Sequence, residues 1–297
     1  IIQHMKNIKK LPFILTILSF LTIFVPANAE IKVVTSIKPI HSLASYLMDG
    51  VGKPDLIVDG YASPHGFALK PSHAKMLQEA DLVFWVGEDV ENFLEKPLKS
   101  IAKKAEKIEL MEIKGLTKLK FRERNIFDEH GHKEEEHGHK EDEHGHDEHA
   151  HGEHDPHIWL DPMNAKVILS EMAEHLIEND SKNEAKYKAN LKRAHKDLDQ
   201  LTKKVKSELN KDFKSIVFHD AYQYFEKRFD INVLGAFTVN TDVMPGAEQL
   251  AEIREVIEHD KVSCIFSEPQ FNPDIIKAVA KDTNVATRCN GSIRSYT

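Results

Sequence analysis

The sequence predicts an α/β fold made of two α/β lobes with parallel sheets, joined by a long rigid helix. Short apolar runs alternate with segments of helical spacing, at the interval that βαβ units need. Several of these runs are apolar throughout, which is typical of parallel strands that are buried on both faces. The alternation occurs twice, before and after one long charged segment of helical character. This repetition indicates two lobes.

The first half supplies three expected strands and two expected helices. The strands are apolar or β-branched runs at residues 31–37, 55–60 and 81–87. Helices are expected between them, at residues 38–50 and 70–80. The first helix is indicated by the helical spacing of its apolar residues Ile40, Leu43 and Leu47.

Two helices are expected in the middle of the chain. Asp161 supplies a capping oxygen and Pro162 suits the first helical position, so we expect a helix from there to about Glu178. A longer helix at residues 182–210 is rich in Lys, Glu, Ala and Leu, with sparse apolar positions. This pattern suits an outer helix or a rigid connector between the lobes.

The second half repeats the order of the first. Strands are expected at residues 215–220, 231–237 and 262–269, and helices at residues 221–229, 246–260 and 271–283. The expected domains are a signal peptide at 1–29, an N-terminal lobe at 30–181, a connecting helix at 182–210 and a C-terminal lobe at 211–297.

The N-terminus has the parts of a cleavable secretory signal. Three lysines precede an apolar run of about fifteen residues, and Ala27-Asn28-Ala29 follows as an A-x-A cleavage site. A membrane-spanning helix needs about twenty apolar residues, so this run is too short for an anchor. We expect export with removal of the signal, and a bacterial periplasm fits best.

The charge of the chain argues against one class of partner. Of the formal net charge of -8, residues 128–157 contribute -10, because they hold twelve acids and two lysines. The rest of the chain therefore sums to about +2. It carries no basic stripe of the kind that binds nucleic acid, and we expect no nucleic-acid partner.

A histidine-rich acidic tract occupies residues 128–155, where HGH recurs with a period of seven and large apolar residues are almost absent. With nothing to bury, the tract is expected to be disordered. Imidazoles beside carboxylates should bind a metal such as zinc weakly. The role of the tract could be to capture zinc, to form a second site near the cleft or to buffer zinc, or it could have no essential role; capture is the role we favour. The histidines of this tract are His130, His132, His137, His139, His144, His146, His149, His151 and His154.

Three other histidines lie where parallel sheets place ligand sites. His65 follows an expected strand, His219 ends another, and His157 comes just before a helix start. Ligands bind outside the carboxyl ends of such strands, so a cleft between the lobes could bring the three together. Three neutral imidazoles suit tetrahedral zinc and leave one position over. A lone histidine in such a place is more often structural, and spacing alone does not decide between these readings.

Five stretches carry a family resemblance: ASPHGFALKPS, PHIWLDP, VFHDAYQYFEKRF, GAFTVNTDVMPG and CIFSEPQF. In order and spacing they resemble the periplasmic zinc-binding component of bacterial high-affinity zinc ABC importers. The resemblance implies a solute-binding protein and not an enzyme. It also implies Zn²⁺ as the transported ligand, a membrane permease as partner and a monomeric state. The implied metal ligands, in the cleft between the lobes, are His65, His157 and His219.

Further residues shape this expectation. Some zinc members of that family have a Glu immediately before the first histidine; here Pro64 stands there, so we expect water as the fourth ligand. Manganese-binding relatives usually have a carboxylate at the third position, so His219 favours zinc, as ligand preference also does. Glu268 and Asp220 are possible auxiliary ligands or supporting residues, and Asp220 could instead cap the next helix.

Two other functions stay open on the sequence. One is a manganese-binding or adhesin-like relative of the same family. The other is a zinc hydrolase, because three histidines plus water also form catalytic zinc sites. The chain lacks a recognisable general-base motif such as HExxH, so the hydrolase is the weaker alternative.

The end of the chain departs from the family. After about residue 287 the sequence reads RCNGSIRSYT, where the family has a DPLG strand and a terminal helix. A frameshift from Arg288 onward would explain this and predicts that the C-terminal lobe lacks its last strand and helix. Cys289 would then be an accident of frame, so we expect no disulfide between Cys264 and Cys289, and the disulfide state of Cys264 stays open.

Overall fold

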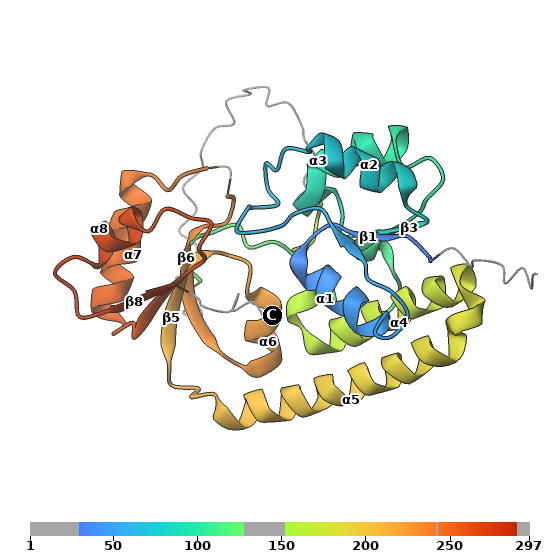
Figure 1. Ribbon diagram of the computed structural model, residues 1–297. Helices are drawn as coiled ribbons and strands as arrows, with labels where there is room; N and C mark the ends of the chain where they lie inside the picture. The colour runs from blue at the N-terminus through green and yellow to red at the C-terminus, as the bar shows by residue number, and fades with distance from the viewer. Residues whose placement is uncertain (1–29, 128–151, 242, 290–297) are drawn as a thin grey trace, which may run out of the picture. The chain divides into compact units, whose positions relative to one another are not determined.

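The computed structural model describes residues 30–127, 152–241 and 243–289, with the side chains of residues 288 and 289 left out (Figure 1). The expected signal peptide and the tract histidines His130 to His151 therefore lie outside the described residues. By their contacts, the described residues from Ile31 onward belong to one compact unit. The boundaries of the two lobes thus stay a prediction.

The first half of the chain forms a parallel four-stranded sheet in the order β2-β1-β3-β4. Its strands are β1 (Val33–Thr35), β2 (Asp55–Leu56), β3 (Leu82–Trp85) and β4 (Glu106–Glu109). The central strands β1 and β3 are buried along their whole length, as their unbroken apolar sequences predict. Figure 1 shows α2 (Pro71–Glu79) and α3 (Glu88–Ser100) on one side of this sheet, and α1 (Lys38–Leu47) and α4 (Pro162–Asn179) on the other.

The second half forms another parallel sheet with the same topology, in the order β6-β5-β7-β8. Its strands are β5 (Lys214–His219), β6 (Asn232–Thr238), β7 (Cys264–Ser267) and β8 (Ala286–Cys289). In Figure 1, α7 (Ala247–His259) and α8 (Asp274–Ala280) lie on one side and α6 (Gln223–Phe229) on the other. The predicted fold class, with two parallel sheets and a long helix, is confirmed.

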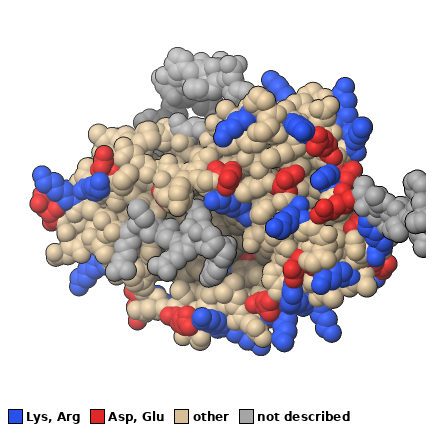
Figure 2. All heavy atoms as spheres, in the orientation of Figure 1, with Lys and Arg blue, Asp and Glu red and all other residues tan. Residues whose placement is uncertain are grey.

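A long helix, α5 (Glu184–Glu208), leads from the first half to β5. It packs against α4 and α1 through its first half, which holds its buried residues Tyr187, Asn190 and Ala194. On the face shown in Figure 2, basic and acidic side chains are interspersed rather than separated by sign. Short 3-10 helices lie at Leu110–Glu112, Ile158–Leu160 and Ser181–Asn183. No helix among the described residues combines the length and the apolar character needed to cross a membrane.

One expectation about the end of the chain is wrong. The C-terminal sheet does have a fourth strand, because Ala286–Cys289 form β8 in parallel register with β7. Ala286 N donates to Ser263 O (3.3 Å) at the start of this strand, and the pairing continues through Arg288 and Cys289. Backbone pairing of this kind does not require a particular side chain. A frameshift from Arg288 onward stays a prediction, and residues 290–297, where a terminal helix would begin, lie outside the described residues.

Residues 119–127, called the strap below, connect the two halves in a way that the sequence does not predict. The strap forms an antiparallel bridge between Lys120 and His154 at one end, and another between Ile126 and Gly235 of β6 at the other. A segment of the first half therefore lies along the edge of the second sheet.

Candidate metal centre

The first histidine of the candidate site lies in a tight turn between β2 and α2. Phe67 N donates to Pro64 O (3.4 Å), and Gly66 has a φ of 82°, which a type II turn requires at its third residue. His65 is the second residue of this turn and is half-buried. Its backbone N donates to Ser63 Oγ (3.2 Å).

The second histidine, His157, is held just before α4. The Asp161 carboxylate accepts a hydrogen bond from Met163 N (2.8 Å), so the predicted cap with Pro162 after it is confirmed. Arg228 of α6 binds the same carboxylate through two nitrogens, at 2.7 and 2.6 Å. This arrangement fixes the start of the helix and the chain immediately before it.

A carboxylate orients the ring of His157. Asp155 Oδ1 lies 2.9 Å from His157 N and 2.7 Å from His157 Nδ1, and both residues are buried. A carboxylate can only accept at these contacts, so Nδ1 carries a proton and the nitrogen left to coordinate a metal is Nε2. Sequence reasoning missed Asp155, although its position two residues before His157 was a usable signal.

The third histidine ends β5, as the sequence predicts. His219 is buried, and the chain after it is tied to β6 through Asp220 N to Thr238 O (3.1 Å). Burial, and then the neighbouring His157 and His65, hold the pKa of His219 well below its ordinary value of 6.5. The ring is therefore neutral at pH 7, which is the form that binds a metal.

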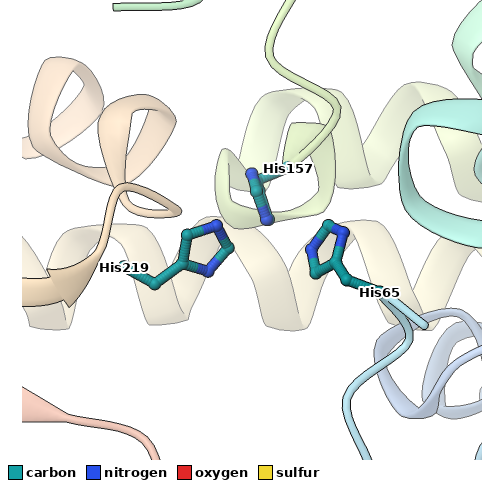
Figure 3. Close-up of side chains that lie close together, drawn as sticks. All are labelled: His65, His157 and His219. Atoms are coloured by element: carbon teal, nitrogen blue, oxygen red, sulfur yellow. The ribbon is translucent and has the colours of Figure 1, made fainter. Parts of the chain in front are cut away.

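The structure brings these three histidines together (Figure 3). Their ring centroids lie 6.2 Å apart for His65 and His157, 5.5 Å for His65 and His219, and 4.9 Å for His157 and His219. One nitrogen from each ring lies within 4.8 Å of the others. Tetrahedral zinc, with Zn–N bonds of about 2.0–2.1 Å, separates its nitrogens by about 3.4 Å. Side-chain movements of about an ångström would bring the three nitrogens to that spacing.

The two auxiliary candidates lie beside this group and have different partners. Arg122 of the strap binds the buried Asp220 carboxylate at 2.8 Å. Burial raises the pKa of Asp220 to about 7. The alternative that Asp220 caps α6 is wrong, because that helix begins at Gln223 with Tyr222 at its N-cap.

Glu268 follows β7 and has one carboxylate oxygen, Oε2, that is buried and makes no hydrogen bond among the described residues. Burial raises its pKa to about 7, opposed by a hydrogen bond with Tyr222 and by the nearby His157. The carboxyl thus lies near the histidines without belonging to their group. An auxiliary role for Glu268 or Asp220 stays a prediction.

Of the tract histidines, His154 falls within the described residues. It is half-buried and pairs with Lys120 through the backbone, and it does not belong to the three-histidine group. Outside the tract, His175 lies in a second group with Glu106 and Glu178. Its Nδ1 is 2.8 Å from Glu106 Oε1. Because both carboxylates are exposed, a surface ion-pair cluster accounts for this group.

Comparisons with known proteins point in one direction. A family model described as zinc-uptake complex component A, periplasmic, matches residues 33–294. A Brucella abortus (strain 2308) protein named high-affinity zinc uptake system protein ZnuA is 43% identical over 272 residues, covering 86% of this chain and 81% of its own. A Yersinia pestis protein of the same name is 41% identical over 265 residues, with the same two coverages. A solved ZnuA crystal structure matches with a TM-score of 0.70 at 21% identity, covering 86% of this chain and 89% of that one.

Proposed function

Because this chain belongs to the family of periplasmic zinc-uptake component A, we propose that it is a solute-binding protein that captures Zn²⁺ and delivers it to the membrane permease of a zinc ABC importer. Two relatives, at 43% and 41% identity, are named high-affinity zinc uptake system proteins. The family acts in the periplasm, and the cleavable signal peptide at residues 1–29 stays a prediction.

We propose that the zinc ligands are His65, His157 and His219. One observation carries this assignment: three histidines from three separate segments converge, with one nitrogen of each within 4.8 Å. Each is fixed by local structure, namely a turn, a hydrogen bond to a carboxylate and the end of a buried strand. With Pro64 immediately before His65, the fourth position is left to water.

The donor set favours zinc over manganese. Imidazole nitrogens suit zinc, whereas manganese prefers carboxylate, carbonyl and water oxygens. The low pKa of the buried His219 leaves its imidazole neutral, and so available to either ion, at neutral pH. A manganese-binding relative is the competing proposal, and calorimetric competition between the two ions discriminates them. Manganese displacing zinc at comparable concentrations would overturn the zinc assignment.

The proposed action is coordination and release rather than catalysis. Three neutral ligands hold the ion without neutralising its charge, and release needs the ligands to separate when the protein docks on its permease. The hydrolase alternative predicts turnover of an ester or amide by the zinc-loaded protein. Carrier function predicts a dissociation constant for zinc below the micromolar range and no such turnover.

Zinc titration of single variants tests the ligand assignment. We expect His65→Ala, His157→Ala and His219→Ala each to lower the affinity for the most tightly bound zinc. The loss should exceed the roughly 10–100-fold that removal of a supporting residue causes. Competition against a chromophoric chelator measures that affinity. His259→Ala is the matched control, because His259 lies at the end of α7 with a side chain that is 86% exposed. An unchanged tight site in any of the three ligand variants would remove that residue from the assignment.

A further inference from the structure

The strap links the chain beside one proposed ligand to the sheet that carries another. At its first end, Leu119 O accepts a hydrogen bond from Asp155 N (2.8 Å), two residues before His157. The Lys120–His154 bridge continues this pairing. The same Asp155 holds the His157 ring through its carboxylate. The strap is therefore paired directly with the segment that positions His157.

At its other end, the strap extends the second sheet at the edge strand β6. Ala236 N donates to Asn125 O (2.8 Å), and Phe127 N donates to Leu234 O (2.9 Å). The Asn125 side chain adds hydrogen bonds from Nδ2 to Ala236 O (3.0 Å) and Phe237 O (2.8 Å). These contacts satisfy edge groups of β6, the strand that pairs with β5 and its terminal His219.

The middle of the strap carries Arg122 into an acidic pair. Its Nη1 lies 2.8 Å from Asp220 Oδ1, and its Nη2 lies 2.5 Å from Glu226 Oε2 of α6. Both carboxylate side chains are buried, at 5% and 7% exposure. The guanidinium also stacks over the Phe127 ring at 3.8 Å. Arg122 thus fixes the strap to the residue immediately after His219.

We propose that the strap is a positioning element of the metal centre, which sets the spacing of His157 and His219 before zinc arrives, with Arg122 as its positioning residue. Six residue steps separate the two antiparallel bridges, so they can lie at most about 20 Å apart. The histidine side chains need to move by only about an ångström to reach the spacing of tetrahedral zinc. A strap that holds His157 and His219 near this spacing before zinc binds would account for so small a movement. The inference rests on the proposed function, since it concerns ligands of zinc.

Two substitutions release the strap by independent means. Arg122→Ala leaves the buried Asp220 and Glu226 carboxylates facing each other without their cation, which buried acids tolerate poorly. Gly235→Ala changes no charge. A Cβ at Gly235 would lie 2.5 Å from Asn125 O, a backbone atom of the strap, so the strap must move away. Arg124→Ala is the matched control, because Arg124 is an exposed arginine of the same strap.

The test is zinc affinity of the full chain by chelator competition, with the visible absorption of bound Co²⁺ as a report on ligand geometry. We expect Arg122→Ala and Gly235→Ala each to weaken the tight site about tenfold or more and to change the Co²⁺ spectrum. Arg122→Lys should restore part of the affinity, and Arg124→Ala should match the wild type. Arg122→Ala and Gly235→Ala both detach the same strap. The double variant should therefore bind zinc no more weakly than whichever single variant has the lower affinity.

The outcomes separate this inference from the proposed function. Folded Arg122→Ala and Gly235→Ala proteins with wild-type affinity and an unchanged Co²⁺ spectrum would overturn the positioning role while leaving the ligands in place. Additive losses in the double variant would also count against a shared strap. If His65→Ala binds zinc as tightly as the wild type, the proposed site fails instead. If Arg122→Ala does not fold, Gly235→Ala and Arg122→Lys still decide the question.

Discussion

Asp155 illustrates how one side chain can prepare a neighbouring ligand. Its Oδ1 contacts both the backbone N and the ring Nδ1 of His157, and its Oδ2 accepts from Gln223 Nε2 of α6 (3.1 Å). The carboxylate therefore selects one tautomer of His157 and restricts the rotation of its ring. Partners of this kind also raise the basicity of a metal-bound imidazole.

Replacing Asp155 with alanine tests this role. We expect the tight zinc affinity to fall about 10–100-fold, because the ring of His157 loses its fixed tautomer and orientation. Asp199→Ala serves as the control, since Asp199 is a half-exposed acid that pairs with Lys166 away from the three histidines. Chelator competition gives both affinities, and an Asp155→Ala protein that binds zinc as the wild type does would show that the contact is dispensable.

The three histidines could be predicted because the sequence around each one indicates where a strand ends or a helix begins. His65 and His219 could be placed because strand-like runs precede or include them, and His157 because a helix cap follows it. The contacts of Arg122 with Asp220 and Glu226 could not be predicted, because they form only when the strap crosses to the second sheet. Nor could the burial of Glu268 be predicted, since its surroundings come from segments distant in sequence.

Among the elements, those with uniform apolar character were the easiest to predict. The buried strands β1, β3 and β5 match the expected runs. Neither β4 nor α3 is predicted from the sequence. In the edge strand β4 the charged Glu106 and Lys107 are both exposed and Ile108 is buried. The strand therefore lacks the regular alternation of apolar and polar residues by which strands are predicted. In α3 an interior Pro97 and a non-helical Glu91 obscure the helical pattern.

The two halves of α5 should respond differently to substitution. Asn190 is buried in the first half, and its Nδ2 donates to Leu47 O (2.7 Å) and Asp49 O (2.9 Å) at the end of α1. Asn190→Ala leaves both carbonyls without this donor, and we expect a loss of about 2–3 kcal/mol in the free energy of unfolding. Leu201 in the second half is 50% exposed. Leu201→Ala should therefore change the free energy of unfolding by no more than about 0.5 kcal/mol.

Urea unfolding of the zinc-free protein measures both changes from the transition midpoints. A loss for Leu201→Ala as large as that for Asn190→Ala would contradict the view that α5 is held mainly through its first half.

For the whole molecule, the central question is whether the histidine-rich tract and the metal centre are separable. We expect a protein in which a short Gly-Ser linker replaces residues 128–151 to keep one tightly bound zinc and to lose weakly bound zinc. The deletion should spare Gly152, whose N donates to Asp89 Oδ1 (2.8 Å), and His154, which pairs with Lys120.

Calorimetric titration with zinc counts both classes of ion. A control protein keeps the full length of the tract but has Ser in place of its histidines between residues 130 and 151, which separates the effect of the imidazoles from that of chain length. Loss of the tight zinc in either protein would mean that the tract, rather than the three converging histidines, supplies the principal ligands.

The three proposed ligands come from segments that are far apart, with 91 residues between His65 and His157 and 61 between His157 and His219. An unfolded chain cannot hold them together, so zinc at this centre binds the native state alone. A thousandfold excess over the dissociation constant then raises the free energy of unfolding by about 4 kcal/mol. The tract histidines are close neighbours in sequence and remain available after unfolding, so zinc bound there adds far less. A protein that has delivered its ion is therefore easier to unfold, and to cleave, than one that carries it.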